Sequence, residues 1–501
     1  MREKSKLFFI NGSILTATAL LMKFASLVFS IYVTNKIGSE AVGIFTLIMT
    51  VYLFFITIAT SGLNVAVSVL VSEYFAKDKG KLAIKTIRTC ILCSLLLGLF
   101  ASFLIIIFSN FIINVCLHNR VSSKILFYIG AGLPFIAMSA CINSYFTSIR
   151  KAYKNAITQV FEFVVKVIAT IYLLKMNISK GVENICISLI LADVISEVCS
   201  FTLVYILYKL DIRSKKYNNI HSFGQRLNIL KISFPVAVTS YIRSGLSALK
   251  QLIIPSQLEK SGLSCEHSLS AYGMINGMIL PVITFPTVLI YSYCQLIIPE
   301  ISTYCAQNNF KAINYVSNKA FKILCSFAFC IAFIFWKFSN ELGMAIYNNV
   351  EAGLYFKILA PLTFFMYVDH IVDCILKGLN KQFGVMCCNI IDLCFTTCFI
   401  YFLLPIYGIK GYLFSFVFSE ILNFSISFWQ MIKYSRIRIN VLEWFIFPFA
   451  IGTLTIFISN IFHFSFSNMV VNLIMNILLF VTTYFLLAFF TLKKNILLFN
   501  K

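Results

Sequence analysis

Apolar runs long enough to cross a membrane, about 18 residues or more, recur along this 501-residue chain from one end to the other. Such runs form helices in a bilayer, because no water is present there to satisfy exposed backbone groups. They also differ from the short alternating segments of an outer-membrane barrel. The sequence therefore predicts an all-α integral membrane protein.

Composition excludes a soluble multidomain enzyme and a disordered chain. Hydrophobic residues make up 59% of the sequence and charged residues 12%, whereas a soluble protein has about 25% charged residues. The 52 Phe and 24 Tyr are too many apolar aromatic residues for a disordered chain. Most of the 16 Cys lie inside apolar runs, where we expect packing rather than a disulfide or a metal site.

We expect fourteen membrane-spanning helices. Their predicted ranges are 7–33, 42–70, 86–113, 125–148, 156–175, 184–208, 228–254, 270–298, 319–339, 354–376, 384–404, 410–432, 442–462 and 469–491. The first range follows a basic N-terminus, as the apolar core of a signal peptide does. It carries Lys23 and lacks a small-x-small cleavage site, so we expect a retained helix.

The loops between these ranges alternate in charge. The chain has 41 Lys and Arg against 19 Asp and Glu, which gives a net charge of +22. One set of alternate loops holds 28 of the Lys and Arg residues, and the opposite set holds 8. Cationic loops stay on the cytoplasmic side, so we expect a multi-pass protein of the cell membrane with both termini cytoplasmic. This bias explains the positive charge without a nucleic-acid partner.

Similar residues recur at a constant offset of 227 in the numbering. The pairs are Glu73 and Glu300, Pro134 and Pro361, Arg150 and Lys377, Lys154 and Lys381, Gly181 and Gly408, and Asp193 and Glu420. Six matches at one offset indicate a duplicated six-helix unit in parallel orientation, a transporter architecture with its sites between the halves. The predicted organisation is an N-terminal lobe of helices 1–6 at 1–208, a basic cytoplasmic linker at 209–227, a C-terminal lobe of helices 7–12 at 228–432, and helices 13 and 14 with the tail at 433–501.

Three cations inside predicted spans are candidates for function, because ionisable residues are costly to insert there. Lys23 lies in the first helix of the first half, and Arg243 and Lys250 lie on one face of the first helix of the second half. They predict a substrate-binding site for a phosphate group, to which Arg offers a bidentate fork. The alternative is that each cation pairs with a carboxylate on a neighbouring helix.

Two pairs of charged residues lie in the fifth and sixth predicted helices. Glu162 and Lys166 are four residues apart, a spacing that predicts an ion pair within one helix. Asp193 and Glu197 have the same spacing, but their charges are alike. These two carboxylates require a nearby cation, a shared proton or water, and Lys166 is one candidate partner.

A further charged cluster lies in the tenth predicted helix. Asp369 and Asp373 share a face, and His370 lies between them in the sequence. Such a group could relay protons or cations. Lys377 follows one turn later, so a solvated helix end is the alternative.

The eleventh predicted helix contributes one more carboxylate. Asp392, with Asn389 and Thr396, offers oxygen atoms on one helix face. A Na⁺ ion would need more oxygen ligands than one helix supplies. We predict Asp369, Asp373 and Asp392 as the candidate residues for ion or proton coupling.

Motifs for nucleotide hydrolysis and other catalysis are absent. The sequence has no Walker A loop, GxSxG elbow, HExxH motif or Rossmann glycine pattern. We therefore expect no catalytic residue, no metal site and no cofactor, with energy from an ion gradient, the membrane potential or substrate consumption. A membrane-embedded enzyme with His370 as base is an alternative that lacks a nucleophile. An assembly scaffold is another, and it would not explain the buried cations.

Five short segments carry a family resemblance. They are 37–45, 62–73, 232–235, 298–302 and 359–361. Through them the chain resembles, over nearly its whole length, the multidrug/oligosaccharidyl-lipid/polysaccharide flippase superfamily, in particular polysaccharide-biosynthesis transporters of the stage V sporulation protein B type. Lys23 falls where such proteins often carry Arg. Ser30 and Thr396 stand where relatives commonly carry cations, and the cation at the Ser30 position is typical of lipid II flippases.

The resemblance implies two lobes that form a V, alternating access and a lipid-linked saccharide substrate. We therefore expect a flippase, not an enzyme, that moves an undecaprenyl-pyrophosphate-linked saccharide, such as a peptidoglycan or spore-cortex precursor, to the outer leaflet. Its expected partners are this substrate and membrane lipids, and we expect a monomer. The alternative is an ion-coupled small-molecule or multidrug exporter on the same fold, in which carboxylates rather than cations bind the substrate.

Overall fold

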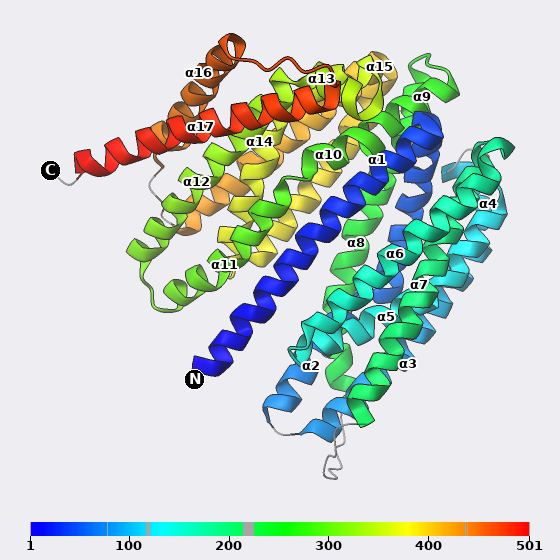
Figure 1. Cartoon of the computed structure of the whole chain (residues 1–501). Coiled ribbons are helices and arrows are strands. Elements are labelled where there is room, and N and C mark those ends of the chain that lie inside the picture. Colours follow the sequence, from blue (N-terminus) through cyan, green and yellow to red (C-terminus); the bar gives the residue numbers. More distant parts are fainter. Residues whose placement is uncertain are drawn as a thin grey trace. The chain divides into compact units, whose positions relative to one another are not determined.

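The computed structural model describes residues 2–77, 79–116, 121–213, 225–435, 437 and 439–499. Over these residues the chain is built of helices joined by short turns, with no β-strand (Figure 1). The elements are α1 (Arg2–Thr60), α2 (Leu63–Ala76), α3 (Gly80–Ile107), α4 (Ser109–Phe111), η1 (Ile112–Cys116), α5 (Ser123–Ser148), α6 (Ala152–Asn177), η2 (Ile178–Lys180), α7 (Val182–Arg213), α8 (Gln225–Lys260), α9 (Cys265–Tyr272), η3 (Gly273–Ile279), α10 (Leu280–Thr284), α11 (Thr287–Ala306), α12 (Phe310–Lys337), α13 (Ser339–Tyr347), α14 (Val350–Gly378), α15 (Gln382–Ser435), η4 (Leu442–Ile446), α16 (Phe447–Ile461) and α17 (Met469–Phe499).

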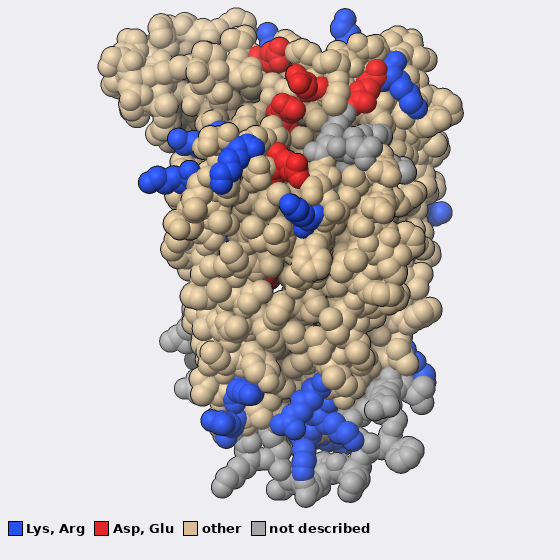
Figure 2. Space-filling view, turned by 90° about the vertical axis from the view of Figure 1, so that its right-hand side faces the viewer, with Lys and Arg blue, Asp and Glu red and all other residues tan. Residues whose placement is uncertain are grey.

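These helices confirm the all-α membrane class. Ten of the described helices are long and apolar enough to cross a membrane, or eleven if Cys265–Thr284 and Thr287–Ala306, bent by 50°, form one span. Each of the fourteen predicted ranges lies on largely helical backbone. α15 holds two of them, whereas α1 holds the first range and the start of the second, which continues into α2. Figure 2 shows charged side chains gathered toward the two ends of one face, with a broad band of almost entirely uncharged side chains between them.

Glycines mark the points where one span turns directly into the next. Gly38 in α1 and Gly408 in α15 have φ angles of 81° and 57°. This left-handed region is open to glycine because it has no Cβ. Gly181, with φ of 95°, separates η2 from α7 in the same way. Gly181 and Gly408 are one of the predicted pairs, so both halves turn between their fifth and sixth helices at an equivalent glycine.

Helix boundaries also repeat between the halves. α5 and α14 begin at the same offset as the sequence pairs, and the N-cap side chains of Ser122 and Asn349 accept backbone N–H bonds there. Pro134 and Pro361 are each the twelfth residue of these two helices. α3 and α12 are equal in length, but their starts are separated by three more positions than those of α5 and α14. The offset between the halves therefore changes from one helix pair to the next.

The predicted pair Glu73 and Glu300 differs by three positions from the pairing that the helix ends of α2 and α11 indicate. α2 and α11 end with the same larger offset that separates the starts of α3 and α12. The chain turns after each helix with the same backbone bond, from Lys79 N to Tyr74 O at 2.8 Å and from Asn309 N to Tyr304 O at 2.9 Å. Tyr74 and Tyr304 are thus equivalent, and Glu73 falls just under one helical turn from the register of Glu300.

Unit 1, the first of two compact packing units, comprises residues 1–29, 36–256 and 264–273. Its core lies where α2, α3, α5 and α7 meet, and it includes the fully buried Ala66, Ile87, Ile142, Tyr145 and Val204. Most of these side chains are aliphatic, and they fill the space that the helix backbones leave between them.

Unit 2 comprises residues 30–35, 257–263 and 274–501. α11, α12 and α14 lie side by side (Figure 1) and enclose Ile290, Phe321, Tyr367 and Ile375. The rings of Phe321 and Trp444 stack with centroids 4.4 Å apart, which joins η4 to α12. Through Trp444, η4 is part of the unit 2 core, although it lies after the two predicted repeat halves.

The packing units do not coincide with the predicted lobes. α8, predicted to open the C-terminal lobe at residue 228, packs within unit 1 up to residue 256. Residues 214–224, most of the predicted linker at 209–227, lie outside the described residues. The division into 1–208, 209–227, 228–432 and 433–501 therefore remains a prediction about the repeat.

Candidate functional site

The three predicted substrate-binding cations lie on two helices of unit 1. Gly38 divides α1 into a first arm, before the glycine, and a second arm after it. Lys23 is on the first arm of α1, and Arg243 and Lys250 are on α8. The spacing of Arg243 and Lys250 spans two helical turns, so both lie on one face of α8. Lys23 and Arg243 are exposed, and Lys250 is half-buried.

Lys23 and Arg243 lack a carboxylate partner in the part of the chain that the structure describes. Lys166, another cation inside a span, has one, because its Nζ lies 2.6 Å from Oδ1 of Asp193. The sequence left two roles open for intramembrane cations, a ligand site or an ion pair. The ion-pair role applies to Lys166 and, among the described residues, not to Lys23 or Arg243.

Hydrogen bonds to the second arm of α1 hold α8 in place. The Tyr241 hydroxyl donates to the carbonyl of Ile58 at 3.1 Å. The hydroxyls of Ser244 and Thr57 are 3.2 Å apart. Near one end, Gly62 lets the backbones meet, since a Cβ there would lie 2.2 Å from the Ser233 carbonyl oxygen. These contacts fix the helix that carries Arg243 and Lys250.

Unit 1 also contains a cluster of carboxylates between α6 and α7. The Ser200 hydroxyl on α7 donates to Oε2 of Glu162 on α6 at 2.9 Å. Lys166 pairs across the same helix interface with Asp193. The structure therefore places the Lys166 ion pair between helices, rather than within α6 to Glu162 as the four-residue spacing predicts.

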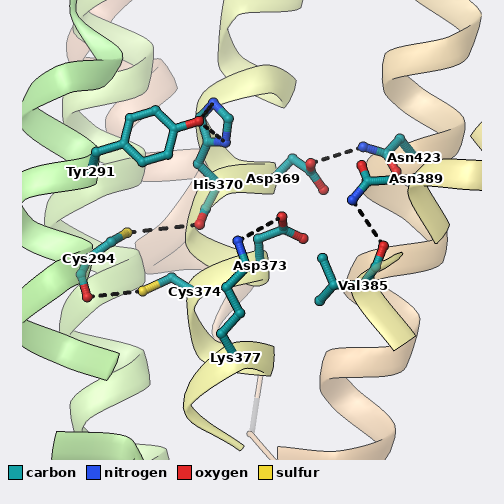
Figure 3. Close-up of polar contacts among 10 residues, drawn as sticks. All are labelled: Tyr291, Cys294, Asp369, His370, Asp373, Cys374, Lys377, Val385, Asn389 and Asn423. Carbon is teal, nitrogen blue, oxygen red and sulfur yellow. Dashed lines mark hydrogen bonds and ion pairs between the residues drawn. The ribbon is translucent and has the colours of Figure 1, made fainter. Parts of the chain in front are cut away.

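In unit 2 the predicted coupling residues Asp369 and Asp373 have different partners (Figure 3). Asp369 is 8% exposed, and its Oδ2 accepts a 3.0 Å bond from the Asn423 side chain on α15. Its Oδ1 has no hydrogen-bond partner among the described residues. Asp373 instead pairs with Lys377, one turn along α14, at 3.4 Å. Asp369 is thus a buried carboxylate with an incomplete set of partners, and Asp373 belongs to the helix-end pair that the sequence offered as the alternative.

Asp392, the third predicted coupling residue, lies in a network of hydroxyl groups. Its Oδ1 accepts from the Ser419 hydroxyl at 2.5 Å and from the Thr396 hydroxyl at 3.2 Å. Asn389 donates its amide to the carbonyl of Val385 at 3.0 Å (Figure 3). Within the described ranges, no group of three His, Cys, Asp or Glu side chains could hold a metal ion.

The pattern of the sequence identifies the family. A family model described as "Polysaccharide biosynthesis protein" matches residues 9–302, more than half of the chain. The chain belongs to this family. It is 23% identical to stage V sporulation protein B of Bacillus subtilis (strain 168) over 418 residues, which cover 81% of this chain and 80% of that protein. It is 20% identical to sporulation protein YkvU of the same organism, over 75% of this chain and 84% of that protein.

Solved structures show the same fold at low identity. The chain superposes on the lipid II flippase MurJ in an inward closed conformation with a TM-score of 0.70, at 14% identity, over 96% of this chain and 99% of MurJ. It superposes on an inward-facing multidrug resistance transporter of the MATE family with a TM-score of 0.63, at 13% identity, over 84% and 98%. At these identities, the two likenesses concern the fold.

His370 of this family member contacts an aromatic ring. The imidazole centroid lies 4.6 Å from that of Tyr291 on α11. The Tyr291 hydroxyl is 3.2 Å from Nε2 and 3.3 Å from Nδ1 (Figure 3). This contact joins α11 to α14.

One buried charge, Asp211 near the end of α7, was not predicted from the sequence. Its side chain accepts from the Tyr145 hydroxyl at 2.9 Å and from Lys154 at 3.1 Å, and it also pairs with Lys151. These partners come from α5, from α6 and from the turn between them. A signal was present, since Asp211 is the single acid in a basic stretch from Lys209 to Arg213.

Proposed function

We propose that this protein is a flippase that moves an undecaprenyl-pyrophosphate-linked saccharide across the cell membrane by alternating access. The family match supports a role in polysaccharide biosynthesis. The names of its relatives support a role in sporulation, and MurJ, named as a lipid II flippase, shares the fold over nearly the full chain. The protein acts as a transporter, not an enzyme.

The observation that carries this proposal is that the cations inside the spans differ in whether a carboxylate neutralises them. Lys166 is neutralised by Asp193, whereas Lys23 and Arg243 have no carboxylate among the residues described. An uncompensated charge inside a membrane protein is costly, so such cations are kept where a ligand anion meets them. A pyrophosphate supplies that anion.

In this proposal Lys23, Arg243 and Lys250 bind the pyrophosphate. Arg243 offers the planar fork that matches phosphate oxygens, and the two lysines add point charges. The lipid tail stays among the membrane lipids while the saccharide crosses. The protein works as a monomer and requires no cofactor.

Asp369, Asp373 and Asp392 in unit 2 are the proposed coupling residues. Asp369 is the strongest of the three, since it is buried and only one of its oxygens has a described partner. A proton or a monovalent cation arriving there would remove the cost of its charge. Because the sequence has no nucleotide-hydrolysis motif, we propose that ion movement supplies the energy.

The proposed orientation has both termini in the cytoplasm. The loops that carry 28 of the Lys and Arg residues then lie on the cytoplasmic side, and the loops that carry 8 lie outside. The substrate, made in the cytoplasm, would therefore enter from the more basic side.

The direct test is flipping by the purified protein in liposomes. A lipid-linked saccharide with a fluorescent head-group is incorporated, and its appearance in the other leaflet is followed with a membrane-impermeant quencher. We expect flipping above that of empty liposomes, and no efflux of a cationic dye. Dye efflux without flipping would contradict the proposal and favour the small-molecule exporter.

A further inference from the structure

The carboxylate cluster of unit 1 holds more negative charge than the groups around it neutralise. Glu162 comes from α6, and Asp193 and Glu197 come from α7. Lys166 on α6 is the cation beside them, and its Nζ lies 2.6 Å from Oδ1 of Asp193. If all three were ionised beside one cation, two negative charges would have no counter-charge within membrane-spanning helices, where Asp193 is buried and Glu162 and Glu197 are half-buried.

The contacts across α6 and α7 assign partners to two of the three carboxylates. Lys166 pairs with Asp193 at 2.6 Å, and the Ser200 hydroxyl donates to Glu162 at 2.9 Å. Glu197 lies between Asp193 and Ser200 on the same face of α7, four residues after one and three before the other. It makes no ion pair or hydrogen bond with any other residue that the structure describes.

A buried hydroxyl group without a partner lies beside this cluster. Tyr52, on the second arm of α1, is 3% exposed, and its hydroxyl has no hydrogen-bond partner among the described residues. A Cβ on Gly132 of α5 would lie 3.5 Å from that hydroxyl and 3.2 Å from Val194, the residue after Asp193.

We propose that Glu197 is a proton-binding site of unit 1. The carboxylate takes a proton from water to become a neutral carboxylic acid, and no redox partner is involved. The Tyr52 hydroxyl then serves as hydrogen-bond partner of the acid. Lys166 stays on Asp193 and Ser200 on Glu162. α5 presents Gly132 to the cluster, which adds no charge.

The internal repeat supports the assignment of the proton-binding site to Glu197. The carboxylates Asp193 and Glu420 recur at equivalent positions of the two halves, whereas Phe424 stands at the position equivalent to Glu197. The extra acid is therefore particular to the first half. Lys166 is 38% exposed, so the cluster reaches the surface of unit 1. This site is separate from the proposed coupling residues of unit 2 and does not depend on the proposed function.

Infrared difference spectroscopy of the purified full-length protein tests the site directly. A neutral carboxylic acid has a C=O stretch that a carboxylate lacks, and subtraction of a variant spectrum cancels all other carboxyl groups. We expect the wild-type-minus-Glu197→Gln spectrum at neutral pH to contain this band. The matched control is Glu183→Gln, on an exposed residue in the first turn of α7, and its difference spectrum should lack the band. A wild-type-minus-Glu197→Gln spectrum without the band would overturn the proposal.

Two further variants keep the test decisive if Glu197→Gln fails to fold. Tyr52→Phe removes the proposed hydrogen bond, so the band should move in frequency and keep its intensity. Lys166→Met removes the ammonium group, so Asp193 should take up a proton and the band should grow. An unchanged spectrum in both variants would overturn the proposal. Flipping assays are not needed for this readout, so failure of the flippase proposal would remain distinguishable.

Discussion

Lys166 on α6 pairs with Asp193 on α7, Nζ to Oδ1 at 2.6 Å, although Glu162 is one turn away on its own helix. The pair joins two neighbouring helices and gives Lys166 a structural role. Lys166 differs in this respect from Lys23 and Arg243, which have no carboxylate partner among the described residues.

The Lys166–Asp193 pair should contribute measurably to stability. Breaking a hydrogen-bonded ion pair costs about 1.5–3 kcal/mol, and the partial exposure of Lys166 favours the lower end of this range. We expect Lys166→Met and Asp193→Asn each to lower the thermal unfolding midpoint in detergent, and the double variant to lower it by less than the sum. Strictly additive effects would show that the two side chains are energetically independent.

Asp211 should be among the most sensitive carboxylates in unit 1. Its side chain is fully buried and pairs with Lys151 and Lys154. Asp211→Ala would leave these cations without their counter-charge, and loss of one partner of a buried pair costs about 3–5 kcal/mol. The control is Glu73→Ala, because Glu73 pairs with Lys77 at a largely exposed site, where such pairs contribute about 0–1 kcal/mol. Equal shifts of the unfolding midpoint would contradict the assignment.

Gly62 should tolerate a methyl group less well than Gly181 does. Both have positive φ in regions that are unfavourable for residues with a Cβ, so Ala costs about 1–3 kcal/mol of backbone strain at either position. At Gly62 the new Cβ would also lie 2.2 Å from the Ser233 carbonyl oxygen, whereas at Gly181 no atom lies within 4 Å. We expect Gly62→Ala to lower the unfolding midpoint clearly more than Gly181→Ala. Similar midpoints would mean that α1 and α8 can separate there at little cost.

Several features of the fold could be predicted because they are local in the sequence. Apolar length gave the spans, and Pro134 and Pro361 gave the correct register of α5 and α14. Partners across helices could be predicted only as alternatives, since Lys166 was a candidate partner of Asp193 and Glu197 as well as of Glu162. The spacing of Glu162 and Lys166 indicated an ion pair within α6, but helix packing brings Lys166 to Asp193, and sequence periodicity does not contain that contact.

The candidate site was predicted only in part for the same reason. The cations Lys23, Arg243 and Lys250 were singled out because charge is rare in apolar runs, and their role stays a prediction. Asp211 was not singled out because it lies among surface-like basic residues. The packing of α8 within unit 1 depends on hydroxyl contacts such as Tyr241 with the Ile58 carbonyl. No single-helix pattern indicates such contacts.

The proposed orientation predicts which loops are accessible from each side of the membrane. Ser264 precedes α9, and Lys216 lies in the basic stretch outside the described residues. Cysteine variants at these positions should react with a membrane-impermeant reagent from opposite sides, because loop charge places Lys216 in the cytoplasm. The exposed Cys265 is replaced by Ser in both variants. Reaction from the same side would contradict the fourteen-span topology.

The central claim, that cations in the spans bind a pyrophosphate, is tested most directly by the flipping rate of Arg243 variants in liposomes. Loss of a charge-assisted bond of about 1.5–3 kcal/mol corresponds to roughly a ten- to hundred-fold loss of apparent substrate affinity. We expect this loss for Arg243→Ala and Lys23→Ala, partial recovery in Arg243→Lys, and wild-type rates for the control Lys231→Ala on the same helix. Wild-type flipping by both Arg243→Ala and Lys23→Ala, in folded protein at equal amounts, would contradict the account.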